Sequence, residues 1–138
     1  MINKEFYILK KNPEIMVEIS APSKILFVFD FDHTLIEENS DTFIYNLYEN
    51  KKLPPEIENR YEEGKWTFFM QEIFNNLNQL KITTKEIREL LQTLKLTKGF
   101  SELLSYLQLH SAETDCIIVS DSNSLFIDWI LAISIVKF

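Results

Sequence analysis

The feature that most restricts the fold is a continuous apolar run, residues 24–30 (KILFVFD), which ends in Asp30 and is followed at once by Phe31 and Asp32. A continuous run, rather than an alternating one, is typical of a strand buried on both faces, as in a parallel sheet covered by helices. A buried carboxylate without a partner is costly, and two neighbouring carboxylates repel each other. The pattern therefore predicts a buried strand whose C-terminal end places two carboxylates in one functional site.

A second apolar run, DCIIVS at residues 115–120, is followed by a polar segment and is the second expected strand. Between the two runs the apolar residues recur at helical spacing. The sequence predicts helices from about residue 40, over 55–64, 66–80, 84–94 and 101–110, and after the second strand over 125–133. This order is an α/β layout in which both polar loops follow carboxyl ends of strands, where open parallel sheets bind ligands.

Composition narrows the class of protein. A chain of 138 residues with 46% hydrophobic and 25% charged residues fits one globular domain. A net charge of −7 argues against nucleic acid as a partner and requires a cation beside any anionic substrate. The apolar stretch 129–138 is too short to span a bilayer and residues 1–14 lack a signal-peptide pattern, so we expect no membrane partner and a cytoplasmic location. Cys116, inside the second run, is expected to be a small core residue.

The acidic loop carries the clearest chemistry. Alternation along the strand places Asp30 and Asp32 on one side and turns Phe31 toward the core. Two carboxylates in one site can divide their roles, so that one attacks while its neighbour, with a higher pKa, donates a proton to a leaving group. Beside an anionic substrate the first needs a metal ion, and oxygen ligands select Mg²⁺. Thr34 and nearby backbone amides are candidates to hold phosphate oxygens.

Several segments together resemble the phosphoethanolamine/phosphocholine phosphatase family, which includes pyridoxal-phosphate phosphatases and belongs to the haloacid dehalogenase superfamily. They are FVFDFDHTLIEENSDTFI, GKWTFFMQEIF, TKGFSELLSYL and DCIIVSDSNSLFIDWIL, within about residues 24–131. The resemblance implies an α/β fold with an incomplete Rossmann-like haloacid dehalogenase core, a parallel sheet with helices, and a helical cap inserted after the first strand. Residues 24–39 and 112–138 would form the partial core, residues 40–111 the cap and linking helices, and residues 1–23 an N-terminal extension.

The same resemblance implies a Mg²⁺-dependent phosphatase of small phosphorylated metabolites such as phosphoethanolamine, phosphocholine or pyridoxal 5'-phosphate. Asp30 would be the nucleophile that forms an aspartyl-phosphate, and Asp32 would be the general acid and then the general base. The Asp30 carboxylate and the Asp32 main-chain carbonyl would bind Mg²⁺. Ser120 would hold the phosphoryl group together with Thr34.

Substrate contact is implied for Asp41 and Asp121, which suits a substrate that carries an amine or a quaternary ammonium. Each assignment has a structural alternative. Ser120 can satisfy local backbone at a strand end, Asp41 can favour a helix N-terminus, and Asp121 can cap the following helix.

An aromatic group in the expected cap has two interpretations as well. Its members can form a cation–π cage for a quaternary ammonium or can be part of the cap core. They are Tyr61, Trp66, Phe68 and Phe69.

The chain departs from the family pattern after Ser120. Members of the superfamily need a lysine and a later acidic loop, and this loop usually contains a Gly-Asp pair. The two glycines of this sequence, Gly64 and Gly99, both precede Ser120, so we expect the loop to be absent. Lys137 has no strand and loop to position it. The resemblance is therefore to a C-terminally truncated member, and the sequence predicts weak Mg²⁺ binding and little or no turnover. The alternative function is a catalytically impaired truncated isoform or fragment.

The missing segment also affects the sheet. In the superfamily the strand that carries Asp30 lies in the middle of the sheet, so here the run 24–29 would present an open apolar edge. Such an edge favours pairing with another chain, and self-association is one expectation. The other is that residues 14–19 (EIMVEI) form a short strand that folds back on this edge.

Overall fold

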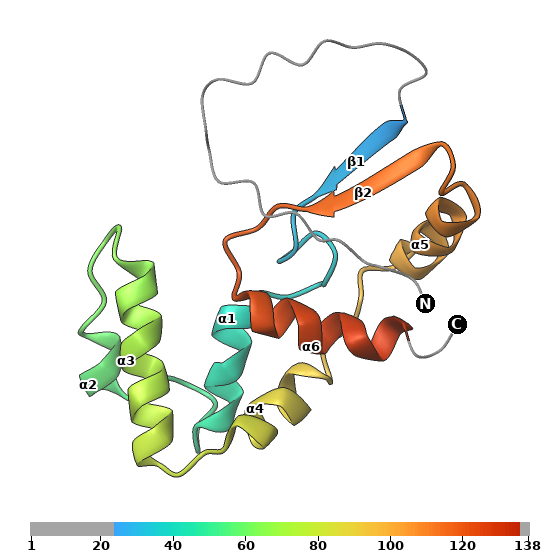
Figure 1. Ribbon diagram of the computed structural model, residues 1–138. Coiled ribbons are helices and arrows are strands. Elements are labelled where there is room, and N and C mark those ends of the chain that lie inside the picture. The colour runs from blue at the N-terminus through green and yellow to red at the C-terminus, as the bar shows by residue number, and fades with distance from the viewer. Residues whose placement is uncertain (1–23, 136–138) are drawn as a thin grey trace. The chain divides into compact units, whose positions relative to one another are not determined.

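The computed structural model describes residues 24–135 (Figure 1). The elements, in chain order, are β1 (Ile25–Phe29), α1 (Ser40–Phe43), the 3-10 helix η1 (Ile44–Leu47), α2 (Pro55–Glu58), α3 (Trp66–Gln79), α4 (Thr84–Leu91), α5 (Phe100–Leu109), β2 (Thr114–Ile118) and α6 (Ser124–Ile135). The expected extension over residues 1–23, with its strand at 14–19, and Lys137 lie outside the described residues.

The two strands confirm the predicted α/β class and the parallel arrangement. β1 and β2 pair in parallel, with Ile25 opposite Thr114 and Phe29 opposite Ile118. Parallel neighbours need a long crossover connection, and here all the intervening elements are helices. The register brings the carboxyl ends of the two strands to the same edge of the sheet.

The described residues fall into two compact units. The first, which we call the sheet unit, comprises residues 24–37 and 95–121 and contains β1, β2 and α5. The second, the helical unit, comprises residues 38–94 and 122–135 and contains the remaining helices. The division into extension, core and cap expected from the resemblance stays a prediction.

Helix α5 packs on the sheet unit's strands. The Phe100 ring meets the Phe29 ring edge-on, with centroids 6.0 Å apart. The Thr114 hydroxyl donates to the main-chain oxygens of Leu107 at 3.2 Å and His110 at 2.9 Å, which fixes the end of α5 to the start of β2. Gly99 has a φ of +86° just before the helix, a conformation that glycine adopts without steric cost.

The prediction that the first strand is buried on both faces is wrong for the described residues. Leu26 is 54% exposed and Val28 is 56% exposed, whereas Phe27 and Phe29, on the other face, are partly covered. The reason is that α5 is the one helix packed on this sheet within the described sheet unit. Cys116 is likewise exposed rather than a core residue.

The helical unit is built around α3. Its buried residues Phe69, Ile73 and Leu77 recur at helical spacing and form one apolar side of the helix. Phe74 on α3 meets Phe126 on α6 edge-on at 5.9 Å, and α4 packs against both η1 and α6. Burial of these apolar side chains supplies most of the free energy that holds the helices together.

Two predicted helices are shorter than the sequence suggested. The segment 55–64 is helical only over α2 and then turns, with Gly64 at a φ of +78°. The helix expected to run to residue 94 ends at Leu91. Terminal turns lack intrahelical partners and are therefore set by local capping rather than by apolar spacing. Within residues 24–135 no helix combines the length and the apolar character that a membrane crossing requires.

Candidate active site

The carboxylate of Asp30 is held by two donors of its own loop. Its Oδ1 accepts the Phe31 N–H at 2.7 Å, and its Oδ2 accepts the Thr34 hydroxyl at 3.5 Å. Hydrogen bonds to an ionised carboxylate are stronger than neutral ones. Asp30 itself is exposed, so this oriented carboxylate is accessible to a ligand.

The loop that follows β1 is folded around the main chain of Phe31. The Phe31 carbonyl accepts the N–H groups of Thr34 at 3.2 Å, Leu35 at 2.8 Å and Ile36 at 3.3 Å. The Phe31 side chain is fully buried, as alternation predicted, while Asp32 is only partly covered. His33 has a φ of +57°, which turns the chain sharply within this loop.

The end of β2 lies beside this loop. Val119 donates its N–H to the Phe29 carbonyl at 2.8 Å, and Phe29 is opposite Ile118 in the register. Asp30 therefore follows one strand and Ser120 follows its neighbour at the same edge. Within the sheet unit, Asp32 and Thr34 lie in the loop that follows Asp30, and Asp121 follows Ser120.

The capping role considered for Asp121 belongs to another residue. The Asn123 side chain accepts the Leu125 N–H at 3.0 Å, and the Asn123 carbonyl accepts the N–H groups of Phe126 and Ile127. Asp121 is exposed. A Ser/Asn-rich loop offers several capping candidates, and the sequence alone did not select among them.

Asp41 lies in the helical unit, in the first turn of α1, where Asn39 is the N-cap. It is only 6% exposed, and its Oδ2 accepts the indole N–H of Trp66 at 2.9 Å. The pKa of Tyr45 is raised to about 12, first by burial of its side chain and second by the negative charge of Asp41. Asp41 is thus both a first-turn acid and a buried, oriented carboxylate. Its bond to Trp66 spans 25 residues of sequence, and no local pattern could have identified it.

Three of the four aromatic residues of the expected cap group contact one another, and the fourth, Phe68, does not join them. The Tyr61 and Phe69 rings are 5.2 Å apart and the Trp66 and Phe69 rings 5.8 Å apart, so these three form one cluster. Phe69 is a core residue, but Tyr61 is about half exposed and Phe68 is largely exposed. Phe68 therefore belongs neither to the core nor to this cluster.

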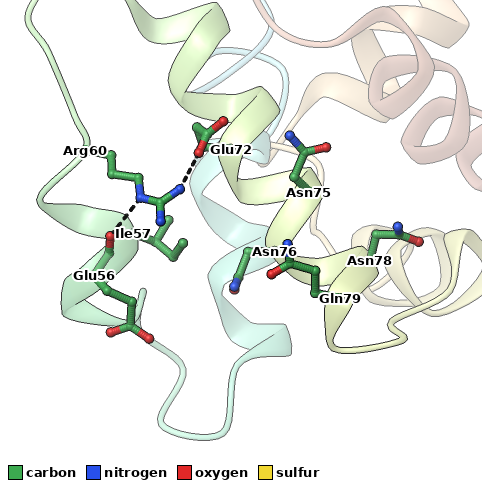
Figure 2. A pocket seen from close by; sticks show the side chains of 8 residues that line it. All are labelled: Glu56, Ile57, Arg60, Glu72, Asn75, Asn76, Asn78 and Gln79. Carbon is green, nitrogen blue, oxygen red and sulfur yellow. Dashed lines mark hydrogen bonds and ion pairs between the residues drawn. The ribbon is translucent and has the colours of Figure 1, made fainter.

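A hollow of about 580 Å³ in the helical unit was not predicted from the sequence. Figure 2 shows its polar lining along α2 and α3, with the Arg60–Glu72 ion pair at 2.5 Å. The lining residues are Glu56, Ile57, Arg60, Glu72, Asn75, Asn76, Asn78 and Gln79. None of the predicted site residues is among them.

Mg²⁺ fits the oxygen donors at the end of β1. The Asp30 carboxylate and the Asp32 main-chain carbonyl are hard ligands of the kind that Mg²⁺ prefers, and this ion commonly takes one or two carboxylates and keeps several waters. Within residues 24–135 no group of three His, Cys, Asp or Glu side chains is placed to share a metal ion. The Asp30 carboxylate and the Asp32 carbonyl are the two described groups that would hold such an ion.

Comparison with known proteins assigns the family. Residues 25–137 match the family described as "Putative Phosphatase". The chain belongs to this phosphatase family. It is the family of the haloacid dehalogenase superfamily that the sequence segments indicated.

Individual members of the family show the extent of the likeness. The chain is 46% identical over 108 residues to the pyridoxal phosphate phosphatase of Rattus norvegicus, covering 78% of this chain and 45% of that protein. It is 45% identical over 108 residues to the pyridoxal phosphate phosphatase of Homo sapiens, with the same coverage. With the phosphoethanolamine/phosphocholine phosphatase of Homo sapiens it shares 29% identity over 113 residues, 82% of this chain and 42% of that protein. The chain thus spans less than half the length of these relatives.

Proposed function

We propose that this chain carries a Mg²⁺-dependent phosphomonoesterase site that works through an aspartyl-phosphate on Asp30. The observation that carries the proposal is the register of β1 and β2, because it places Asp30 and Ser120 at one edge in a chain of a phosphatase family. The proposed fold is a partial Rossmann-like haloacid dehalogenase core with a helical cap. Residues 24–39 and 112–138 are proposed for this core, residues 40–111 for the cap and linking helices, and residues 1–23 for an N-terminal extension.

The first step is attack on phosphorus. A carboxylate oxygen of Asp30 forms the new P–O bond while the ester P–O bond breaks. The leaving oxygen takes a proton from the Asp32 carboxyl, so that the product leaves as an alcohol and not as an alkoxide. The hydrogen bond from the Phe31 N–H holds the Asp30 carboxylate for this attack. Ser120 donates to a phosphoryl oxygen.

The second step releases phosphate. The Asp32 carboxylate takes a proton from water, the water oxygen forms a bond to phosphorus, and the bond to Asp30 breaks with return of its carboxylate. Mg²⁺, when bound to the Asp30 carboxylate and the Asp32 carbonyl, neutralises charge between carboxylate and phosphate. Thr34, in the same loop, holds a phosphate oxygen.

The substrate is a small phosphorylated metabolite with a cationic part. The relatives are named for pyridoxal phosphate and for phosphoethanolamine and phosphocholine, and we propose the same group of substrates here. Asp41 and Asp121 are proposed to contact the part of the substrate away from the phosphate. A cytoplasmic location, without a nucleic acid or membrane partner, is part of the same proposal.

The competing proposal is a catalytically impaired chain that binds phosphate or Mg²⁺ weakly and does not turn over. It is supported by the acidic residues at the site, because Asp30, Asp32 and a phosphate dianion need more positive charge than the described loop supplies. The two proposals agree on the site and differ in turnover.

The deciding experiment measures phosphate release from phosphoethanolamine, phosphocholine and pyridoxal 5'-phosphate, with and without Mg²⁺. Asp30→Asn removes the nucleophile, and Asp115→Asn is the matched control because Asp115 is an exposed acid on β2 beyond the site. Release that needs Mg²⁺, stops in Asp30→Asn and continues in Asp115→Asn supports the phosphatase. No release from a chain that circular dichroism shows to be folded supports the impaired alternative.

A further inference from the structure

His33 has a backbone conformation that is unusual for a residue with a side chain. Its φ of +57° lies in the left-handed region, which most such residues avoid, although histidine is among those enriched there. Conformations of this kind persist only where surrounding contacts hold them, and they cluster at functional sites. Among the described residues, the other non-glycine residues with a positive φ, Lys51 and Lys81, lie in the helical unit. His33 lies instead in the acidic loop, directly after the proposed general acid Asp32.

The imidazole of His33 is bound to the main chain four residues further on. Its Nδ1 lies 3.1 Å from the carbonyl oxygen of Glu37. A carbonyl oxygen can only accept, so Nδ1 carries the proton and donates it. Glu37 is itself held, because its N–H donates to the Lys95 carbonyl at 3.3 Å. The ring therefore connects the acidic loop to the second segment of the sheet unit, which begins at Lys95.

The segment that anchors this ring is a short antiparallel bridge. Ile36 pairs with Leu96, and Thr97 donates its N–H to the Leu35 carbonyl at 3.0 Å. The side chains of Leu35 and Ile36 are buried. Because buried side chains are closely packed, they keep the main chain of this bridge in place. The bridge is thus a fixed point from which the imidazole can hold the exposed part of the loop.

The φ angle of His33 determines where the Asp32 carbonyl points. Rotation about the N–Cα bond of His33 turns the peptide plane between Asp32 and His33 relative to the rest of the loop. The rest of the loop is fixed, because the Phe31 carbonyl accepts the N–H groups of the three residues that follow His33. A change from +57° to an ordinary helical φ would turn this peptide plane, and the Asp32 carbonyl with it, by about 120°.

We propose that His33 is a positioning residue: its hydrogen bond to Glu37 holds the left-handed φ that directs the Asp32 main-chain carbonyl. This carbonyl is one of the two groups proposed to bind Mg²⁺, so the inference rests on the proposed function and deepens it. It does not require turnover by this chain. Residues that orient a metal ligand without touching the metal typically change its affinity 10–100-fold when they are replaced.

Three replacements separate the two properties of His33. Asparagine tolerates a positive φ, and its Nδ2 amide takes the place of the imidazole Nδ1, so His33→Asn retains both properties. His33→Gly permits the positive φ but removes the donor. His33→Ala removes the donor and keeps the steric cost of the positive φ. The asparagine variant is therefore expected to preserve the site, and the alanine variant to damage it most.

The first test uses Mn²⁺ as the probe, because Mn²⁺ binds the same carboxylate and carbonyl oxygens as Mg²⁺. Electron paramagnetic resonance of free Mn²⁺ gives the dissociation constant of the full chain. We expect it to rise about tenfold in His33→Ala, by less in His33→Gly, and to be unchanged in His33→Asn. Lys81→Ala is the matched control, because Lys81 is exposed and has a φ of +62° outside the site. Circular dichroism verifies that each variant is folded.

Asp30→Asn distinguishes failure of this inference from failure of the proposed site. If Asp30→Asn weakens Mn²⁺ binding and His33→Ala does not, the site exists and His33 does not position it. If Asp30→Asn leaves Mn²⁺ binding unchanged, the ion binds elsewhere, and both the proposed metal site and this inference are wrong. A loss in His33→Asn as large as that in His33→Ala would also overturn the inference, because the donor and the φ would then not be what matters.

A second measurement needs no bound ion and decides the question in a chain that binds no Mn²⁺. Nitrogen-15 NMR of the neutral imidazole is expected to show the proton on Nδ1. Amide hydrogen exchange of the three residues that follow His33 is expected to be faster in His33→Ala than in wild type, and unchanged in His33→Asn. A neutral ring with its proton on Nε2 would overturn the hydrogen bond. Equal exchange in His33→Ala and wild type would overturn its role in holding the loop.

Discussion

The indole N–H of Trp66 donates to the Asp41 carboxylate at 2.9 Å and so joins the first residue of α3 to the first turn of α1. Asp41 is only 6% exposed, so this carboxylate relies on protein donors more than on water. A hydrogen bond to a charged group is worth more than a neutral one. The bond therefore both stabilises the helical unit and orients the carboxylate that we propose to contact substrate.

Replacing Trp66 by Phe is expected to lower the free energy of unfolding by about 1.5–3 kcal/mol, because the buried carboxylate loses a donor. Asp41→Asn retains an acceptor oxygen for the indole, so it is expected to lower the free energy of unfolding by less than the Trp66 replacement does. Phe68→Leu is the control, since Phe68 lies on the same helix and is largely exposed. Urea unfolding measures all three. A Trp66→Phe variant as stable as Phe68→Leu would show that the bond contributes nothing.

Ionisation of Tyr45 makes the free energy of unfolding of the helical unit depend on pH in the alkaline range. Burial and the charge of Asp41 raise its pKa from 10.0 to about 12. The folded state therefore holds the phenolic proton more tightly than the unfolded state, so this contribution is complete below pH 10 and is lost as pH rises toward 12.

Tyr45→Phe is expected to make the decline in unfolding free energy between these pH values shallower. Ultraviolet titration of tyrosinate in Asp41→Asn is a second measurement, in which removal of the charge brings the pKa of Tyr45 closer to its ordinary value. The prediction is wrong if wild type and Tyr45→Phe lose stability in parallel over this range.

The sequence predicted the elements that depend on local patterns. Both strands, a helix that begins near residue 40 and the long helix from Trp66 were found where apolar runs and apolar spacing placed them. The acidic loop was also predictable, since alternation turns Phe31 inward and leaves Asp30 outside.

Features that depend on tertiary contacts were not predictable in the same way. The exposure of Leu26 and Val28 depends on what covers the sheet, and an apolar run reports only a capacity for burial. The Trp66–Asp41 bond joins residues 25 positions apart, so it follows from how α1 and α3 pack. Asn123 rather than Asp121 caps α6 because of loop geometry that composition does not encode.

Helix α4 begins with a reciprocal capping arrangement that can be tested directly. The Thr83 hydroxyl oxygen accepts the Glu86 N–H at 3.2 Å, and the Glu86 carboxylate accepts the Thr83 N–H at 2.8 Å. The hydrogen bonds from Thr83 lower the pKa of Glu86. The stabilisation from this charge is therefore present above the ordinary pKa of 4.5 and is lost as pH falls through the lowered value.

Thr83→Ala is expected to lower the free energy of unfolding by about 1 kcal/mol at neutral pH, because the first turn loses its side-chain acceptor. Thr84→Ala is the matched control, one residue further on inside the helix, where alanine is at least as favourable as threonine. Thermal unfolding of both variants compares them. Equal melting temperatures for the two variants would rule out a stabilising cap.

Because Asp32 is proposed to be the general acid, the loss of rate on its replacement is expected to depend on the leaving group of the substrate. Asp32→Asn is expected to lower the rate of phosphate release from phosphoethanolamine by about 10²–10⁴-fold, because the alkoxide then leaves without a proton. With p-nitrophenyl phosphate, whose phenolate leaves readily unprotonated, the first step should be slowed much less. Rapid-mixing measurement of the p-nitrophenolate burst separates this step from release of phosphate. Equal losses with both substrates in the burst phase would assign Asp32 to binding rather than to proton transfer.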